Sequence, residues 1–510
     1  MSATKNGAQN RNKKEIDIKR YAVLAAFVVL SAVAIGRGWE PSGFAGTLLI
    51  TGILLFIFYR DIKRYKPQHL KGYNTLLLLG AVLIGTLSLG RLSEYILAGL
   101  TKGLGIEPGA YIFGMPLAAG AMLVGLLFDF HIAMVFSLVV SLLAGLWQAD
   151  AAYPVYVFAG SLTAAFSVIR CSRRTAILRG GLYVMAVNIL VTATIYLWRG
   201  ELLTAGLPPA LLFSVFSAAA AVAIVSVLLP AFESLFKVTT DISLLELLDL
   251  DHPLMKNLMA TAPGTYHHSI IVGNLVDSVA ESIGVNHLLA RVAAYYHDIG
   301  KLKMPEYFIE NLPSGESRHE KLSPHLSGMI LISHVKEGVE LATHYRLPKP
   351  IVDIIEQHHG SSLITYFYQK AKGLEAGEPP SEEEYKYPGP KPQSRVAALV
   401  MMADAVEAAS RVLVEPTPAR IKSLVDRIID HMYLEGQLDE CEITFKDINE
   451  VKKSFTFILT GILHKRVDYP GFDFEEKKGE GPHKQPPKED KTKPERDRER
   501  LAPGPPLVRA

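Results

Sequence analysis

The chain has 510 residues, of which 49% are hydrophobic and only 20% are charged, a composition too apolar for one soluble globule. The 53 basic and 51 acidic residues leave a formal net charge of +2, so bulk charge gives no case for binding a nucleic-acid polymer. Cys171 and Cys441 lie far apart with no partner spacing, so neither a disulfide framework nor a thiolate zinc site is supported.

A basic arm at residues 1–20 precedes a long apolar half of the chain, residues 21–230. A helix needs about 20 apolar residues to cross a bilayer, because each residue rises about 1.5 Å and its backbone polar groups must be bonded internally. We therefore predict a polytopic bundle of about eight transmembrane helices in contact with lipid. The expected helices are Tyr21–Gly36, Phe44–Tyr59, Thr75–Ala98, Tyr111–Phe128, Ile132–Trp147, Val155–Ile169, Leu182–Trp198 and Leu211–Leu229.

Basic residues in the loops give this count an independent test. Lysine and arginine gather at residues 1–20, 60–71 and 170–179, whereas residues 148–154 and 200–209 are nearly free of them. Because such charges stay preferentially on the cytoplasmic side, we expect both termini in the cytoplasm. That requires an even number of crossings, which favours two separate helices on either side of the short run 128–131.

The first apolar segment could be a cleaved signal peptide or a membrane anchor. It has a basic leader, but Gly36–Glu40 is a poor small-residue cleavage site, so we expect an uncleaved anchor. Ionisable residues are scarce in the apolar half, and Arg91, Glu94 and Asp129 lie near expected helix ends. This scarcity argues against a transporter or a pump.

The second half of the chain has the composition of a soluble enzyme. Residues 231–256 are expected to form a connecting helix, and residues 257–470 repeat apolar side chains at three- and four-residue intervals, which is typical of helices. Residues 471–510 are rich in Gly, Pro and charge and are expected to be disordered. The expected fold is therefore all-α, with a helical membrane bundle followed by an all-helical cytoplasmic domain.

Histidines and aspartates in the second half form a pattern that suits metal binding. They are His267–His268, His297–Asp298, His334, His358–His359 and Asp404. Imidazoles and carboxylates together suit Mn, Fe or Zn. Neighbouring residues on a helix diverge by about 100°, so each adjacent pair is expected to serve two neighbouring ions, with the two-oxygen carboxylate of Asp298 shared between them.

A pair of cations about 3.5–4 Å apart suits phosphodiester hydrolysis, because it activates water and stabilises the leaving oxygen. The helix that carries His297 and Asp298 is expected to break at Gly300, which places Lys301 beside the proposed ions. We expect Lys301 to contact the substrate phosphate. The alternative is a solvated lysine at a helix C-terminus.

Several motifs of the second half resemble those of the HD-domain phosphohydrolases. They are Ala262–Ser269, His297–Lys301, Ser333–Lys336, Glu356–Gly360 and Met402–Asp404. The chain is more closely similar to the membrane-bound branch of that family, in which a seven-helix membrane module is joined to a C-terminal HD domain, and Tyr387–Gln393 and Gly436–Cys441 also match this branch. The expected eight helices then correspond to one anchor plus seven. The branch usually has an extracytoplasmic sensor domain after its first helix, whereas only Arg37–Gly43 lie there in this sequence.

The resemblance implies a ligand set for two divalent transition-metal ions, with Mn or Fe expected. His268, His297, Asp298 and Asp404 would surround one ion, and Asp298, His334, His358 and His359 would surround the other. His267 would be a neighbour of the ligands rather than a ligand. Four further histidines lack ligand positions in the family and are expected at the surface or in loops: His287, His319, His325 and His344.

The resemblance also implies a reaction and a place in the cell. This branch includes bacterial cyclic di-AMP phosphodiesterases, so the chain is expected to open cyclic di-AMP to linear pApA at the plasma membrane. The alternatives are another nucleotide substrate, such as cyclic di-GMP, a nucleotide triphosphate or a guanosine alarmone, and a nucleotide-binding receptor without turnover. Against cyclic di-GMP, Ser361–Ile364 follow Gly360 where that subgroup has Gly-Tyr-Pro. Whether the chain forms a homodimer stays open.

Overall fold

The computed structural model describes residues 2–36, 40–70, 73–107, 109–169, 174–312, 317–374 and 380–463, without the side chains of residues 2–18 and 68. Within these ranges the regular structure is helical, apart from one isolated bridge between Leu363 and Lys386. The all-α fold is confirmed. The expected disordered tail at 471–510 and Cys171 lie outside the described residues.

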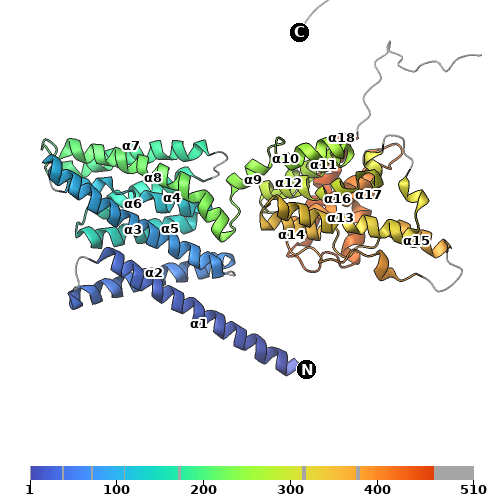
Figure 1. The fold of residues 1–510 in the computed structure, drawn as a ribbon, viewed down its shortest axis with the longest axis horizontal. Coiled ribbons are helices and arrows are strands. Elements are labelled where there is room, and N and C mark those ends of the chain that lie inside the picture. The colour runs from blue at the N-terminus through green and yellow to red at the C-terminus, as the bar shows by residue number, and fades with distance from the viewer. Residues whose placement is uncertain are drawn as a thin grey trace, which may run out of the picture. The chain divides into compact units, whose positions relative to one another are not determined.

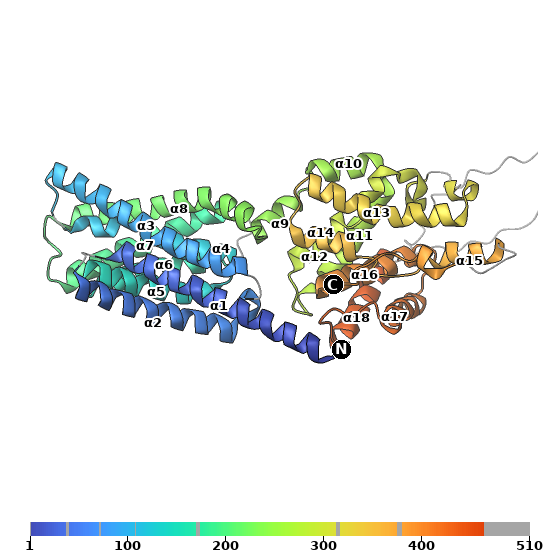
Figure 2. The ribbon, with the colours of Figure 1, turned by 60° about the horizontal axis from the view of Figure 1, so that its bottom comes forward.

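Eight α-helices form the apolar half, at the places that the sequence predicts (Figure 1). They are α1 (Ser2–Ile35), α2 (Pro41–Tyr65), α3 (Tyr73–Leu104), α4 (Ala118–Leu127), α5 (Phe130–Gln148), α6 (Tyr153–Ser167), α7 (Thr175–Trp198) and α8 (Leu207–Phe236), with short 3₁₀ helices η1 (Pro67–Leu70) and η2 (Ala110–Gly114). The helix α1 runs through the basic arm without a break, and it lies beside α2 (Figures 1 and 2).

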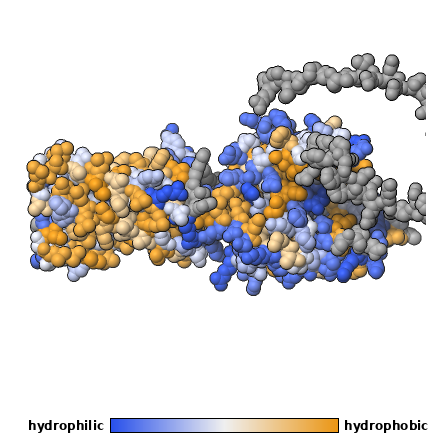
Figure 3. All heavy atoms as spheres, turned by 90° about the horizontal axis from the view of Figure 1, so that it is seen from above, coloured by the Kyte–Doolittle hydropathy of each residue, from blue (hydrophilic) through white to orange (hydrophobic). Residues whose placement is uncertain are grey.

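Apolar side chains cover the outside of this bundle as well as its core. Phe136, Leu143 and Met122 are fully buried, whereas Leu212 and Val227 on α8 are 69% and 72% exposed. Figure 3 shows hydrophobic residues gathered over the bundle, while the surface of the C-terminal domain is more hydrophilic. An apolar surface of this extent is stable only against lipid or another protein.

Six segments within the described residues are long and apolar enough to cross a membrane. They are Pro41–Tyr65, Tyr73–Leu104, Ala110–Leu127, Phe130–Gln148, Thr175–Trp198 and Leu207–Phe236. Of the other two predicted crossings, α6 has only 15 residues, and the apolar part of α1 begins only after the basic arm. Eight crossings therefore stay a prediction, and six meet the length and hydropathy of a span.

The fourth predicted helix is broken inside the bundle. In place of one helix over Tyr111–Phe128, η2 ends at Gly114 and α4 begins at Ala118. Buried hydroxyl groups donate hydrogen bonds to three carbonyls around the break: Tyr153 to Ile112 at 2.9 Å, Tyr156 to Phe113 at 2.5 Å and Ser217 to Met115 at 2.9 Å. A backbone break within an apolar bundle is tolerated where side chains satisfy it in this way.

The fourth and fifth segments are separate helices. The helix α4 ends at Leu127 and α5 begins at Phe130, and the carboxylate of Asp129 accepts a hydrogen bond from the backbone N–H of Ile132 at 3.0 Å. This N-cap satisfies one of the free donors of the first turn. The split that the loop charges favoured is therefore present.

The C-terminal domain is a second helical core. Its helices are α9 (Asp241–Leu247), α10 (Pro253–Thr261), α11 (Pro263–Ala280), α12 (His287–Tyr296), α13 (Pro324–His344), α14 (Lys349–Gln357), α15 (Thr365–Leu374), α16 (Arg395–Ser410), α17 (Pro418–Leu434) and α18 (Phe445–Ile462), with 3₁₀ helices η3 (Ile299–Lys303), η4 (Pro305–Tyr307), η5 (Ile309–Asn311), η6 (Arg318–Lys321) and η7 (Glu382–Tyr385). The central helices are α11, α12 and α16, whose residues Val276, Ala293 and Leu399 are fully buried.

The connecting segment is not one helix. The helix α8 continues through Pro230 to Phe236, and a capping box between Thr240 and Ser243 starts the separate helix α9. A capping box satisfies two free backbone donors at a helix N-terminus. A separate helix, α9, therefore begins within the predicted connection at 231–256.

Candidate metal centre

Five segments of the C-terminal domain supply the seven predicted ligand residues. His268 lies in α11, His297 and Asp298 follow α12, His334 lies in α13, His358 and His359 follow α14, and Asp404 lies in α16. Six of the seven are buried, and the side chain of His359 is 24% exposed. The fold therefore brings all seven together, including residues more than a hundred positions apart.

Gly300 permits the closest of these approaches. A Cβ atom at this position would lie 1.8 Å from the backbone oxygen of His334 and 2.5 Å from the backbone nitrogen of Gly338. Only a residue without a side chain lets η3 contact α13 at this distance. This contact places Asp298, two residues before the glycine, against His334.

One cluster consists of His268, His297, Asp298 and Asp404, with one ligand atom of each within 4.8 Å of the others. His268 Nε2 lies 3.0 Å from Asp404 Oδ1 and 3.6 Å from Asp298 Oδ2. His297 Nε2 lies 3.3 Å from Asp298 Oδ2 and 3.7 Å from Asp404 Oδ1. Two imidazole nitrogens and two carboxylates thus face one point.

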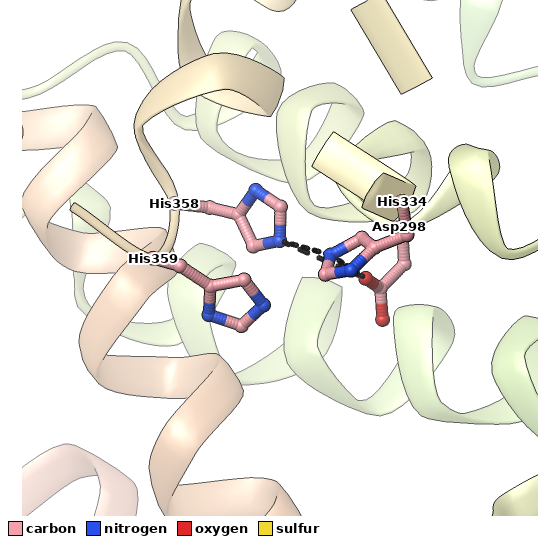
Figure 4. A group of neighbouring side chains, drawn as sticks. All are labelled: Asp298, His334, His358 and His359. Atoms are coloured by element: carbon pink, nitrogen blue, oxygen red, sulfur yellow. Dashed lines mark hydrogen bonds and ion pairs between the residues drawn. The ribbon is translucent and has the colours of Figure 1, made fainter. Parts of the chain in front are cut away.

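The second cluster consists of Asp298, His334, His358 and His359, whose side chains point toward one another (Figure 4). The other carboxylate oxygen of Asp298, Oδ1, lies 3.4 Å from His334 Nε2 and 3.7 Å from His358 Nε2. The two oxygens of Asp298 therefore face different clusters, as the sequence predicted for a shared carboxylate.

Two imidazoles of the second cluster present their Nε2 atoms to a common point. His334 Nδ1 and His358 Nδ1 lie 2.5 Å and 2.7 Å from the carbonyls of Leu331 and Ile355, which can only accept, so each Nδ1 carries the proton. Their Nε2 atoms face each other at 3.3 Å. A divalent cation between the two rings would be bound by both nitrogens.

Buried polar atoms in both clusters also lack hydrogen bonds. Among the described residues, His297 Nε2 and both carboxylate oxygens of Asp298 are buried without a hydrogen-bond partner, although Lys301 Nζ forms an ion pair with Asp298 Oδ2 at 2.7 Å. Unsatisfied buried groups of this kind cost free energy and point to an absent partner. Nitrogen and carboxylate donors without thiolates suit a divalent transition-metal ion.

Burial and charge set the protonation states of the clusters in opposite directions. Burial lowers the pKa of His334 to about 3 and holds the pKa of His359 well below its usual range. Burial also acts on His297, but the carboxylates of Asp298 and Asp404 outweigh it and raise the pKa to about 10. Burial opposes the charge of Asp298, yet Lys301 and His297 hold the pKa of this carboxyl well below its usual range. The aspartate is therefore ionised and two of the second cluster's imidazoles are neutral, as metal ligands must be.

Lys301 is largely shielded from solvent beside the clusters. Its side chain is 14% exposed, and Nζ lies 2.7 Å from Asp298 Oδ2 and 2.8 Å from Glu310 Oε1. Glu310 in turn accepts a hydrogen bond from Thr265 Oγ1 at 3.1 Å. The Lys301 ammonium also lies 5.0 Å from the centre of the Phe308 ring. The helix α12 ends at Tyr296, before the break expected at Gly300, and a 3₁₀ turn carries the lysine inward.

The adjacent pair His358–His359 departs from the expectation for neighbours on a helix. Both rings belong to the second cluster, with centroids 4.1 Å apart. The reason is that α14 ends at Gln357, so the pair lies on a turn and not on a helix. The ring of Tyr387 stacks on His359 with centroids 4.3 Å apart, a contact that the sequence did not predict.

The histidines without an expected ligand role lie outside both clusters. His267, His287, His325 and His344 are exposed or partly exposed and lie outside both clusters. His319, expected at the surface or in a loop, lies in the short 3₁₀ helix η6, where it is buried and contacts the carbonyl oxygen of Tyr307 at 2.8 Å. Glu407 and Glu310, which reach His268 and Lys301, were missed because nothing in their local spacing marks them.

Two family models match the chain and together cover both halves. A model described as a 7TM receptor with intracellular HD hydrolase matches residues 41–240, and a model of the HD domain matches residues 265–409. The first match begins at the first residue of α2 and ends before α9, so it contains the seven helices α2–α8. The chain belongs to this family. It is accordingly a membrane protein with a cytoplasmic HD domain.

Curated relatives match along most of the chain. The chain is 36% identical over 483 residues to the cyclic-di-AMP phosphodiesterase PgpH of Bacillus subtilis, a match that covers 90% of this chain and 66% of the relative. It is 34% identical over 435 residues to PgpH of Listeria monocytogenes, covering 84% of this chain and 59% of the relative. The chain thus spans about two thirds or less of the length of these relatives. The crystal structure of the L. monocytogenes PgpH HD domain is 45% identical, covers 42% of this chain and 100% of that chain, and has a TM-score of 0.40.

Proposed function

We propose that the chain is a metal-dependent phosphodiesterase that hydrolyses cyclic di-AMP to linear pApA. The observation that carries the proposal is the carboxylate of Asp298, whose two oxygens face two separate clusters of metal-ligating atoms. The second support is the naming of two relatives, 36% and 34% identical, as cyclic-di-AMP phosphodiesterases. A pair of neighbouring cations is the arrangement that in-line phosphodiester hydrolysis uses.

The proposed ligands divide as the two clusters do. His268, His297 and Asp404 hold one cation, His334, His358 and His359 hold the other, and Asp298 holds both. Mn or Fe suits this mixture of imidazole and carboxylate. When bound, the cations lower the pKa of a water molecule and neutralise the phosphate charge.

In this proposal Lys301 binds the substrate phosphate and Glu310 positions Lys301. An ammonium has three N–H donors, and ion pairs to Asp298 and Glu310 occupy two directions at Lys301. The third remains for a phosphate oxygen of the substrate. Glu310 keeps the ammonium at this position, because it lies 2.8 Å away and is held by Thr265.

We further propose that the chain crosses the bacterial plasma membrane eight times, with both termini in the cytoplasm. The loop charges and the six apolar spans support several crossings, and an even number leaves the termini on the same side as the HD domain. In this proposal residues 1–20 are a cytoplasmic arm, 21–230 the bundle, 231–256 the connection, 257–470 the HD domain and 471–510 a charged tail.

The direct test uses the full chain, purified in detergent and loaded with Mn²⁺. We expect cyclic di-AMP to be converted to pApA, detected by liquid chromatography and mass spectrometry, and cyclic di-GMP to be converted more slowly or not at all. Intact cyclic di-AMP alongside hydrolysis of another nucleotide would overturn the substrate proposal. Light scattering from the same preparation decides between a monomer and a homodimer.

A further inference from the structure

Glu407 makes a contact that distinguishes one ligand histidine from the others. This glutamate lies on α16, one helical turn after Asp404, and it is 2% exposed. Its Oε2 atom forms a short hydrogen bond with His268 Nδ1. On the other side of the same ring, His268 Nε2 faces Asp404 Oδ1 at 3.0 Å. One helix thus presents both a proposed ligand and the acceptor that orients its partner ligand.

Three other ligand rings have a different acceptor. His297 Nδ1 lies 2.7 Å from the carbonyl oxygen of Ala294, and His334 and His358 face the carbonyls of Leu331 and Ile355 in the same way. These acceptors lie three residues earlier in each ring's own chain segment and carry no net charge. A carboxylate acceptor makes an imidazole a more basic ligand than a carbonyl does.

Glu407 is itself held in place and is not free to bind a cation. Its other oxygen, Oε1, accepts from Arg411 Nε at 2.8 Å and lies 2.7 Å from Arg411 Nη2. One oxygen therefore belongs to Arg411 and the other to His268. The chain Arg411–Glu407–His268 leads from the end of α16 into the first cluster.

We propose that Glu407 is a positioning residue that fixes His268 Nε2 toward the first cluster and strengthens its binding to a cation. The proposal rests on the proposed function only in so far as the two clusters bind metal. It predicts that the two cation sites are unequal, because one of them depends on a buried carboxylate outside its ligand set. Loss of such a partner typically costs a factor of about 10–100 in metal affinity.

The test is Glu407→Gln in the full chain, with Mn²⁺ binding measured by equilibrium dialysis and metal analysis. The amide nitrogen cannot accept from Arg411 or from a protonated Nδ1, so one of the two contacts is lost. We expect two Mn²⁺ per wild-type chain, and in the variant one site weakened by about 10–100-fold with the other unchanged. Electron paramagnetic resonance should change from a coupled pair to a single-ion spectrum when Mn²⁺ is limiting.

A matched control separates positioning from general damage. His431 Nε2 and Glu435 Oε1 form a histidine–carboxylate pair at 3.1 Å on the exposed side of α17, so Glu435→Gln should leave both affinities unchanged. Glu407→Asp keeps the charge and should recover part of the affinity; it also replaces Glu407→Gln if that variant does not fold. Wild-type affinities at both sites in Glu407→Gln would overturn the inference. A wild-type chain that binds no Mn²⁺ would instead overturn the proposed function.

Discussion

Replacing Asp298 by asparagine tests the shared carboxylate with almost no change of volume. Oδ2 lies 3.3 Å from His297 Nε2 and Oδ1 lies 3.4 Å from His334 Nε2. The amide nitrogen of asparagine cannot be a metal ligand. Whichever way the amide is oriented, one cluster receives this nitrogen and loses its carboxylate oxygen. At the position of Oδ2 it would also place a donor against the Lys301 ammonium. Both proposed cation sites therefore lose charge together.

The expected loss follows from what the cations contribute. Charge stabilisation by a bound metal is worth several kcal/mol of the activation barrier, and a loss of about 4 kcal/mol corresponds to about a thousandfold lower rate. The assay is the initial rate of pApA formation from cyclic di-AMP at saturating Mn²⁺. The helical circular dichroism signal should stay at the wild-type level.

Asp277 provides the control for this substitution. It is a partly exposed aspartate on α11 that pairs with His287 at 3.2 Å and Arg291 at 3.6 Å, outside both clusters. Asp277→Asn should keep the wild-type rate. A rate above about a tenth of wild type in Asp298→Asn would correspond to less than about 1.4 kcal/mol and would refute the shared-ligand reasoning.

Three further predictions concern packing, pH and topology. Gly300→Ala should cost at least about 1–3 kcal/mol of unfolding free energy, because its Cβ would meet the backbone of His334 at 1.8 Å; a wild-type thermal midpoint would contradict this. Burial lowers the pKa of His319 despite its bond to the Tyr307 carbonyl, so the folded ring stays neutral where the unfolded ring binds a proton, and stability should fall as pH drops below about 6.5. His319→Gln should make the thermal midpoint less sensitive to pH over this range. An unchanged dependence of the midpoint on pH would contradict this role of His319. The topology is tested in intact cells with single cysteines in a cysteine-free background. Leu203→Cys, at a position 99% exposed, should react with a membrane-impermeant maleimide, whereas Lys63→Cys should react only after permeabilisation. The reverse result would show the opposite orientation in the membrane.

The convergence of the seven candidate ligands was predictable from the sequence, whereas the contacts that support them were not. These residues occur in motifs with a recognisable order, so their proximity could be expected without coordinates. Glu407 is an ordinary glutamate in a helix by local spacing, and only the packing of α16 against α11 brings it to His268. Tyr387 lies in the loop after η7, which sequence patterns do not place in space, yet its ring stacks on His359.

In the bundle, too, the positions of the helices were predictable, whereas a break that depends on tertiary contacts was not. Hydropathy located all eight helices, because apolar runs are long and the loops between them are short. It did not show that the fourth is broken after Gly114, since residues 110–127 read as one apolar run. Hydroxyl groups from α6 and α8 donate to backbone carbonyls at the break, and such tertiary hydrogen bonds leave no periodic signal.

The measurement closest to the central claim relates bound metal to turnover. Mn²⁺ is titrated into the metal-free full chain, and both bound Mn²⁺ per chain and the rate of cyclic di-AMP hydrolysis are followed. If the two clusters act together through Asp298, hydrolysis to pApA should rise only as the second Mn²⁺ per chain is bound. Full activity with one Mn²⁺ per chain, or no hydrolysis with two, would contradict the account.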